Sequence, residues 1–504
     1  MFLIQQLKAS LAVRVCGAGF AAAALVSCTT IARDPQCSRM PASGACRQAV
    51  VVRPTPPRLI ERASSAIKEL WANVSPTGAA RGAVIAARSK HKPNYYYVWT
   101  RDAAIVMNEV VELFLKSRDQ GEAGKYERAL KEYVDFTKKN QETLVKGDLG
   151  EPKFEVDGRA FNEEWGRPQN DGPALRALTL MRIAKALNER GQGKYVRDML
   201  YDGKHEFNSS TVITRDLDYV LHRWRDKDFD AWEEVKGWHF FTRMMQLQAM
   251  RAGAEFAKEM GDAQGAAAYT AEASEIGKAL GRHITKDGYI TATIERETGV
   301  GLDYKHSGLD LLSVMAPLRI YGPDIAFRPS DHRVLGTAFR LIERFREIYP
   351  INGKQDPVAA IGRYPEDKYY EGNPWVIGSY TFAELYFRVA TEFKASGAVE
   401  IRAESEGFFK NLLSAHAEKN AIAPGKKFER GEAVYELVVS ELIAQGERFM
   451  DTPIELPARH GHGPAESPEQ FDKSSGAKVG ADYLTWNFAA YLAALRARES
   501  LNND

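Results

Sequence analysis

Cysteine is rare in this chain and confined to its start. The four cysteines, Cys16, Cys28, Cys37 and Cys46, all lie within the first 46 of the 504 residues. The rest of the chain therefore has no thiol for catalysis and no disulfide framework to hold it together. If the chain is cleaved before Cys28, a short disulfide between Cys37 and Cys46 stays open as a cross-link.

An excess of either charge is also lacking. The 68 Lys and Arg residues nearly balance the 67 Asp and Glu residues, which leaves a formal net charge of +1. Because a basic excess is what neutralises phosphates or anionic lipid, we expect no nucleic-acid partner. With 44% hydrophobic and 27% charged residues, the composition is that of a globular protein with a large core.

The first residues carry the pattern of an export signal. Within residues 1–28, basic residues precede an apolar run over 17–26 that is too short for a permanent membrane span. The string LVSC (25–28) resembles a bacterial lipobox, which implies lipidation of Cys28. A plain signal peptide and a buried helix are the alternatives. We expect an exported protein that is either anchored to the cell envelope or secreted.

A proline-rich tether follows the signal. Residues 29–57 contain five prolines, and this composition disfavours regular structure. From residue 58 the hydrophobic pattern becomes helical, and strand-like alternation of comparable length is absent. We therefore predict one mainly helical domain over 58–504.

Thirteen helices are predicted in this domain. Some have a single apolar stripe and others are apolar over most of their circumference, which is the mixture expected when inner helices are wrapped by outer ones. This pattern favours an all-α fold built as a double-layered helical barrel. The predicted ranges are 58–73, 103–117, 124–145, 173–190, 209–225, 238–260, 264–283, 307–318, 331–348, 375–396, 399–418, 429–447 and 480–498.

Five segments interrupt the helical pattern, and we call them the five aromatic segments: 95–102, 161–173, 230–237, 363–376 and 468–487. They cover about an eighth of the chain but hold five of its eight tryptophans. Loops that enter alternate helices of a barrel gather at one end of it. Indole faces suit the apolar faces of a sugar ring, while charged and amide groups suit its hydroxyls. The segments therefore predict a carbohydrate site.

Paired carboxylates indicate the chemistry. Glu233 and Glu234 adjoin a tryptophan in the string DAWEE (230–234), and Glu469 follows far downstream. Hydrolysis of a glycosidic bond uses one protonated carboxyl and one ionised carboxylate, so glutamates in unlike surroundings meet this need. Taken alone, DAWEE also fits an ordinary helix start, and Glu469 fits the acidic first turn of a helix.

Taken together, the strings point to a family. The segments YYYVWTRD (95–102), FNEEWGRPQNDGPALRA (161–177), DAWEEVKG (230–237), GRYPEDKYYEGNPW (362–375) and PEQFDKSSG (468–476), followed by LTW (484–486), resemble glucoamylase, glycoside hydrolase family 15. The resemblance extends from about residue 58 to about residue 496. It implies an (α/α)6 barrel and inverting release of glucose from the non-reducing ends of α-1,4-glucans.

The resemblance also implies roles for individual residues. Glu233 corresponds to the general acid and Glu469 to the general base. The positions that match substrate-binding residues are Tyr95, Trp99, Arg101, Asp102, Trp165, Gly166, Arg167, Glu234, Arg363, Asp367, Trp375 and Trp486. Among these, an adjacent Arg-Asp pair is also common as a surface ion pair, and Trp375 and Trp486 also fit a hydrophobic core.

The implied substrates are maltooligosaccharides, dextrins or starch. Because the chain ends soon after the last predicted helix, we expect no starch-binding domain, which favours soluble glucans over granules. No cofactor or metal is expected, since His460 and His462 are a weak metal motif, and we expect a monomer. A glucosidase acting on trehalose or α-1,6-glucans, and a non-catalytic glucan-binding module, are the alternatives.

Overall fold

The computed structural model describes residues 53–143, 148–205, 209–319, 326–354, 356–461, 463 and 466–502. The predicted export signal, Cys28 and most of the predicted tether lie outside these residues. Within them, the fold is mainly helical, and its strands are only two to four residues long. No helix of this part of the chain combines the length and apolarity that a membrane span requires.

Six helices form an inner ring in which each contacts the next and the last contacts the first. They are buried around most of their circumference, as α12 illustrates. The ring consists of α3 (Thr100–Lys116), α5 (Asp171–Glu189), α8 (Phe240–Glu259), α10 (Leu311–Met315) with its 3-10 extension η4 (Ala316–Arg319), α12 (Val376–Ser396) and α15 (Thr485–Ser500).

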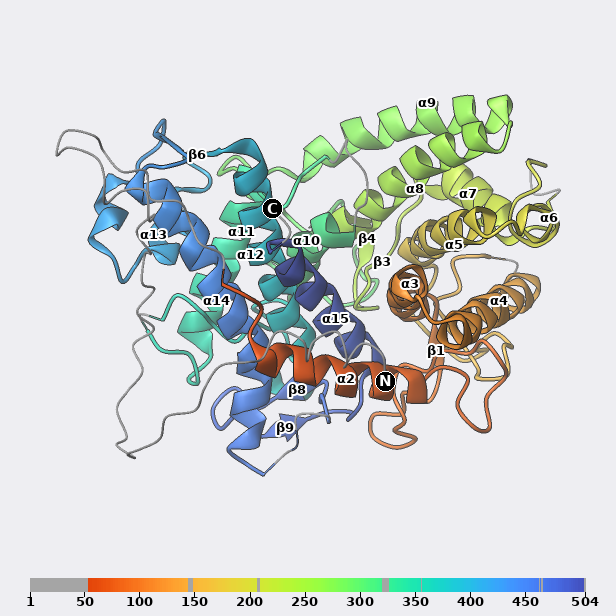
Figure 1. Ribbon diagram of the computed structural model, residues 1–504, viewed down its shortest axis with the longest axis horizontal. Helices are drawn as coiled ribbons and strands as arrows, with labels where there is room; N and C mark the ends of the chain where they lie inside the picture. The colour runs from red at the N-terminus through yellow and green to blue at the C-terminus, as the bar shows by residue number, and fades with distance from the viewer. Residues whose placement is uncertain are drawn as a thin grey trace.

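A second layer surrounds this ring, and each of its helices packs mainly on one inner helix. Figure 1 shows two such pairs, with α9 along α8 and α4 beside α3. Outer helices are buried on one side, so their apolar residues recur at helical spacing. The outer helices are α2 (Pro57–Ala72), α4 (Gln120–Glu142), α7 (Val212–Arg223), α9 (Ala263–Leu280), α11 (His332–Ile348) and α14 (Ala433–Ala458).

The two layers confirm the predicted all-α (α/α)6 barrel. Twelve of the thirteen predicted helices correspond to members of the two layers. Boundaries differ most at α14, which continues to Ala458 through two prolines instead of ending at residue 447. The remaining predicted helix, 399–418, is wrong over most of its length. Only α13 (Glu406–Leu412) is α-helical there, between strand β6 (Ala398–Glu400) and the 3-10 helix η6 (Ala417–Ala421).

The helical segment over residues 193–200 was not predicted. Helix α6 (Gly193–Tyr195) continues into the π-helix η2 (Val196–Leu200). A segment this short has too few residues for a helical period to be recognised. Two further 3-10 turns are η3 (Gly281–His283) and η5 (Tyr369–Glu371).

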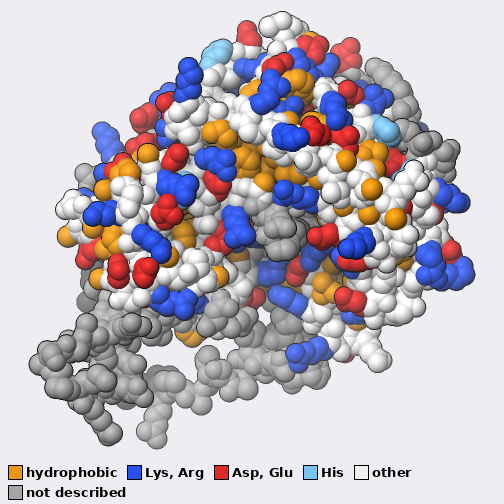
Figure 2. Space-filling view, turned by 90° about the horizontal axis from the view of Figure 1, so that it is seen from above, with side chains coloured by type: hydrophobic (Ala, Val, Ile, Leu, Met, Phe, Trp, Pro, Cys, Tyr) orange, Lys and Arg blue, Asp and Glu red, His pale blue; other side chains and the backbone are white. Residues whose placement is uncertain are grey.

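Short antiparallel ladders fasten the loops between helices. The first pairs β1 (Val98–Trp99) with β2 (Lys153–Phe154), and the second joins β3 (Asp228–Phe229), β4 (Lys236–His239) and β5 (Thr293–Ile294). The others pair β6 with β7 (Lys427–Glu429), and β8 (Gln470–Phe471) with β9 (Lys478–Val479). On the face shown in Figure 2, side chains of both charges are interspersed, in keeping with the near-zero net charge.

Close packing between the layers leads to a first prediction. In α14, a Cβ on Gly446 would lie 2.5 Å from Cε1 of Phe387 in α12. Because the core is tightly packed, we expect Gly446→Ala to lower the free energy of unfolding by about 1–3 kcal/mol. The matched control is Gly277→Ala in α9, where a Cβ would meet no atom within 4 Å. That change should raise stability by about 0.5–1 kcal/mol, because alanine favours helix. Denaturant unfolding measures both, and equal effects would contradict the packing argument.

Candidate active site

A cavity of about 500 Å³ lies at the end of the barrel where the inner helices begin. Each of the five aromatic segments contributes to its wall, so segments far apart in the sequence meet there. Eleven of the fourteen predicted site residues line it: Tyr95, Trp99, Arg101, Asp102, Trp165, Glu233, Glu234, Arg363, Trp375, Glu469 and Trp486. The inner helices explain this grouping. Trp99 and Trp375 are N-cap residues of α3 and α12, and Trp486 lies in the first turn of α15.

Glu469 is fully buried at the wall of this cavity. The hydroxyl of Tyr95 donates a hydrogen bond of 2.7 Å to its Oε1, while Oε2 has no hydrogen-bond partner among the described residues. Burial raises the pKa of the Glu469 carboxyl to about 7, against the opposing effect of the Tyr95 hydrogen bond. The group can therefore exchange a proton near neutral pH.

Because Gly480 has no side chain, the carboxyl of Glu469 can occupy the space beside its backbone. Its φ is +80°, and a Cβ at this position would lie 2.1 Å from Oε2 of Glu469. Glycine is the residue that adopts such a φ without strain and allows so close an approach. The turn after β9 thus brings bare backbone against the carboxyl.

Glu233 is half-buried and held by neutral donors. The indole N–H of Trp99 donates to its Oε1 at 2.7 Å, and the amide of Gln169 donates to the same oxygen at 3.2 Å. The backbone of Glu233 is left-handed, with φ +70°, which is uncommon for a residue with a side chain. The turn is closed by the Glu233 N–H, which donates to the carbonyl of Asp230 at 2.8 Å.

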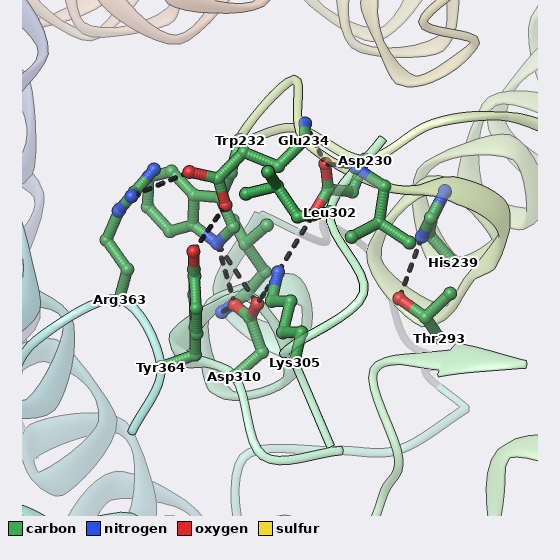
Figure 3. Close-up of polar contacts among 12 residues, drawn as sticks. Asp230, Trp232, Glu234, His239, Thr293, Leu302, Lys305, Asp310, Arg363 and Tyr364 are labelled. Atoms are coloured by element: carbon green, nitrogen blue, oxygen red, sulfur yellow. Dashed lines mark hydrogen bonds and ion pairs between the residues drawn. The ribbon is translucent and has the colours of Figure 1, made fainter. Parts of the chain in front are cut away.

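Beneath this turn lies a buried charge network, shown in Figure 3. Lys305 points between Asp230 and Asp310, with Nζ–Oδ2 distances of 2.8 and 2.7 Å. Asp230 also accepts the backbone N–H groups of Glu234 and Val235. Burial alone would raise the pKa of Asp230, but the charge of Lys305 outweighs it and holds the pKa at about 2. The network therefore fixes the turn through an ionised aspartate.

Asp310 links this network to the aromatic wall. Its carboxylate accepts the indole N–H of Trp232 at 2.9 Å and caps α10 through the N–H of Leu312. Trp232 in turn packs against Trp375 and Trp486, with ring centroids 5.5 and 6.1 Å away. Trp375 and Trp486 are buried and also line the cavity. They therefore fit both predictions made for them, as residues of the hydrophobic core and as residues of the cavity wall.

A second ionic cluster surrounds Glu234. Arg363 donates to Oε1 of Glu234 at 2.8 Å and forms two hydrogen bonds of 2.7 and 2.6 Å with Asp367. The hydroxyl of Tyr364 donates to Oε2 of Glu234 at 2.7 Å. Figure 3 shows Arg363 and Tyr364 both directed at this carboxylate. Glu234 is thus paired with a cation, whereas its neighbour Glu233 is held by neutral hydrogen-bond donors.

Arg101 and Asp102 lie in the first turn of α3, which begins at Thr100, three residues before the predicted start at residue 103. Both are buried, so they do not form a surface ion pair. Arg101 donates to Asp171 at 2.8 Å and to Gln169 at 3.1 Å, while Asp102 lies 3.9 Å from it. Burial raises the pKa of Asp102 to about 7 in spite of Arg101.

Three predicted residues support the wall without lining the cavity. Arg167 turns away to Glu151 and to backbone carbonyls of its own loop. Asp367 holds Arg363. A Cβ on Gly166 would lie 2.8 Å from the carbonyl oxygen of Glu233, so this glycine permits close approach to the acidic turn.

Sequence reasoning missed several residues of the site. Gln169, Tyr364 and Tyr369 lie inside the strings that were recognised, but nothing in the strings marked them out. Lys153 and Lys305 lie outside the five aromatic segments, and the sequence gives no signal for them. Among the described residues, no group of three or more His, Cys, Asp or Glu side chains is arranged to hold a metal ion.

The barrel and its acidic, tryptophan-lined cavity define the class of the protein, a glycoside hydrolase. The chain belongs to glycosyl hydrolases family 15, whose sequence pattern matches residues 67–496. This confirms the resemblance predicted from the sequence.

Two curated relatives are similar over most of this chain. A glucoamylase of Blastobotrys adeninivorans is 33% identical over 450 residues, covering 86% of this chain and 70% of the relative. Glucoamylase 1 of Rhizopus oryzae is 34% identical over 436 residues, covering 84% of this chain and 68% of the relative.

Solved structures show the same fold. The glucoamylase of Saccharomycopsis fibuligera superposes with a TM-score of 0.77 at 27% identity, covering 92% of this chain and 99% of that chain. A family 15 glucoamylase from Hypocrea jecorina gives a TM-score of 0.76 at 29% identity, covering 88% and 73%. The inner and outer rings are therefore those of the family.

The Lys305 network generates a second prediction. Lys305→Met removes the buried cation and leaves Asp230 and Asp310 facing each other, so we expect a loss of about 3–5 kcal/mol in the free energy of unfolding. The control is Lys194→Met, which removes an exposed ion pair to Asp198 and should change stability little. Urea unfolding of both variants measures the difference. A Lys305→Met protein as stable as the control would show that the network does not hold the turn.

The raised pKa of Glu469 generates a third prediction, about stability and pH. Between the ordinary value of 4.5 and about 7, the folded protein keeps a proton on this carboxyl that the unfolded chain has released. Stability contributed by the group is therefore present at low pH and is lost as pH rises through about 7. We expect Glu469→Gln to gain stability over wild type by on the order of 3 kcal/mol between about pH 4 and about pH 8.

The measurement is the free energy of unfolding of both proteins across that pH range. Glu164→Gln, the same substitution at an exposed position, serves as the control for the change from Glu to Gln. A difference between Glu469→Gln and wild type that stays constant with pH would contradict the assigned pKa.

Proposed function

We propose that this protein is an exo-acting, inverting hydrolase that releases β-glucose from the non-reducing ends of α-1,4-glucans. One observation carries the proposal. Glu233 and Glu469 line the same cavity, and each is held by neutral donors instead of a cation. A carboxyl held in this way can gain or lose a proton without breaking an ion pair, which is what acid and base catalysts must do.

In the proposed reaction, Glu233 is the general acid. It transfers its proton to the glycosidic oxygen as the bond between this oxygen and the anomeric carbon breaks. Trp99 and Gln169 both donate to Oε1 of Glu233, which leaves Oε2 for the proton that is transferred. The developing charge on the carboxylate is then already hydrogen-bonded.

Glu469 is the proposed general base. A water molecule attacks the anomeric carbon from the opposite face and gives a proton to Oε2, the oxygen that has no protein partner among the described residues. Tyr95 holds the other oxygen and so sets the direction of the carboxylate. An inverting reaction requires the two carboxyl groups to stand about 6.5–9.5 Å apart, with room for this water.

The proposed sugar contacts use the remaining wall. Arg101 and Asp102 present a guanidinium and a carboxyl to the hydroxyls of the reacting glucose, while Arg363 and Glu234 serve the next sugar. The indole faces of Trp165, Trp375 and Trp486, together with the ring of Trp99, offer apolar surface to the sugar rings. Maltooligosaccharides, dextrins and starch chains present the free ends that such a site takes.

The test is hydrolysis of maltotetraose followed by NMR, with the anomer of the released glucose recorded at early times. We expect β-glucose from wild type. Glu233→Gln and Glu469→Gln should each lower kcat by about 10²–10⁴-fold, because each removes one partner of general acid–base catalysis. Glu164→Gln, an exposed neighbour of the cavity wall, is the control and should keep wild-type kcat.

Trehalose and isomaltose are assayed beside maltotetraose. α-Glucose as the first product would overturn the inverting mechanism. Cleavage of trehalose or isomaltose in preference to maltotetraose would change the assigned substrate, and no turnover of any of the three would favour a glucan-binding module.

A further inference from the structure

Lys153 is enclosed by aromatic rings at the wall of the cavity. Its Nζ lies 3.7 Å from the ring centroid of Trp165, 3.9 Å from Phe161, 4.1 Å from Tyr97 and 4.9 Å from Trp99. The residue is only 4% exposed. We call these four rings and the ammonium the lysine cage.

The backbone places Lys153 opposite Trp99. Lys153 opens β2 and Trp99 closes β1, and the register of the antiparallel pair sets the two residues across from each other. Cross-strand neighbours on one face of a sheet interact directly. The ladder therefore holds the backbones of the two residues side by side.

No hydrogen bond or ion pair to the Lys153 ammonium is recorded across the residues that the structure describes. Burial lowers the pKa of Lys153 to about 8, against the opposing charge of Glu233. At neutral pH the group is therefore an ammonium whose surroundings are ring faces, and ring faces attract a cation.

The cage connects directly to Glu233. Trp99, one of the four rings, donates its indole N–H to Oε1 of Glu233 at 2.7 Å. Trp99 also packs against Trp165, with ring centroids 6.1 Å apart. An ammonium that attracts both rings holds the indole in the orientation that this hydrogen bond needs.

We propose that Lys153 is a positioning residue for Glu233. Its ammonium orients the Trp99 indole toward the carboxyl and favours the negative charge that Glu233 acquires when its proton passes to the glycosidic oxygen. This inference rests on the proposed role of Glu233 as general acid. It adds a cation that acts through an aromatic ring and does not itself react.

Two substitutions separate charge from bulk. Lys153→Met keeps the length of the side chain but removes its charge. We expect kcat on maltotetraose to fall at least about 10-fold with KM within about threefold, because small displacements of a catalytic group cost rate. Lys153→Arg keeps a cation that stacks on ring faces, and kcat should stay within about fivefold of wild type.

The matched control is Lys125→Met, because Lys125 lies 4.4 Å from the Trp71 ring on the exposed surface of α4. It removes a cation from a tryptophan face that lies outside the cavity wall and should leave kcat and KM unchanged. Circular dichroism and thermal unfolding establish that each variant folds.

A kcat of Lys153→Met within twofold of wild type would overturn the proposal, as would equal losses in the Met and Arg variants or a change confined to KM. Should Lys153→Met fail to fold, Lys153→Arg decides, because a folded Arg variant that loses kcat 10-fold or more contradicts the proposal. The variants are compared on whichever of maltotetraose, trehalose and isomaltose wild type cleaves. Wild type inactive on all three would instead refute the proposed function.

Discussion

The structure depends on the burial of its inner ring of helices around most of their circumference. Because α3, α5, α8, α10, α12 and α15 are surrounded by protein, charged side chains inside them need partners, as Glu384 has in Arg319 and Arg176 has in Asp216. All six starts lie at the same end, and the residues there form the cavity. Charged groups in such a place are costly unless they are paired. The pairing of charges at this end is therefore a condition for the barrel as well as for the site.

Most charges at this end meet that condition, and the exceptions are informative. Arg101 pairs with Asp171, and Lys305 pairs with two aspartates. Glu233 and Glu469 have no ion pair among the described residues and accept hydrogen bonds from an indole, an amide and a phenol instead. A fixed charge is best held by a counter-ion, whereas a group that changes protonation is best held by neutral donors. The two glutamates are distinguished from their neighbours by the neutral groups that hold them.

The sequence predicted the fold and the members of the site better than their arrangement. Helical periodicity is local, so the long helices of both rings could be recognised, while the short segment over Gly193–Leu200 could not. The tryptophans and the recognised strings marked the loops that meet at the cavity. Lys305 and Lys153 were missed because each acts through pairing across the fold, with Asp230 and with Trp99 respectively. Such pairing depends on strand register and on how deeply each side chain is buried, and neither can be read from a short stretch of sequence.

The acidic turn shows how a strained conformation is maintained. Glu233 has a left-handed backbone without being glycine, which costs free energy that the surroundings must offset. Asp230 offsets it by accepting two successive N–H groups of the turn, and Lys305 keeps Asp230 ionised so that it can do so. Gly166 then allows the neighbouring loop to close on the Glu233 carbonyl. The orientation of Glu233 is therefore set by Lys305, more than seventy residues away in the sequence, and by Gly166. Neither residue contacts the carboxyl of Glu233.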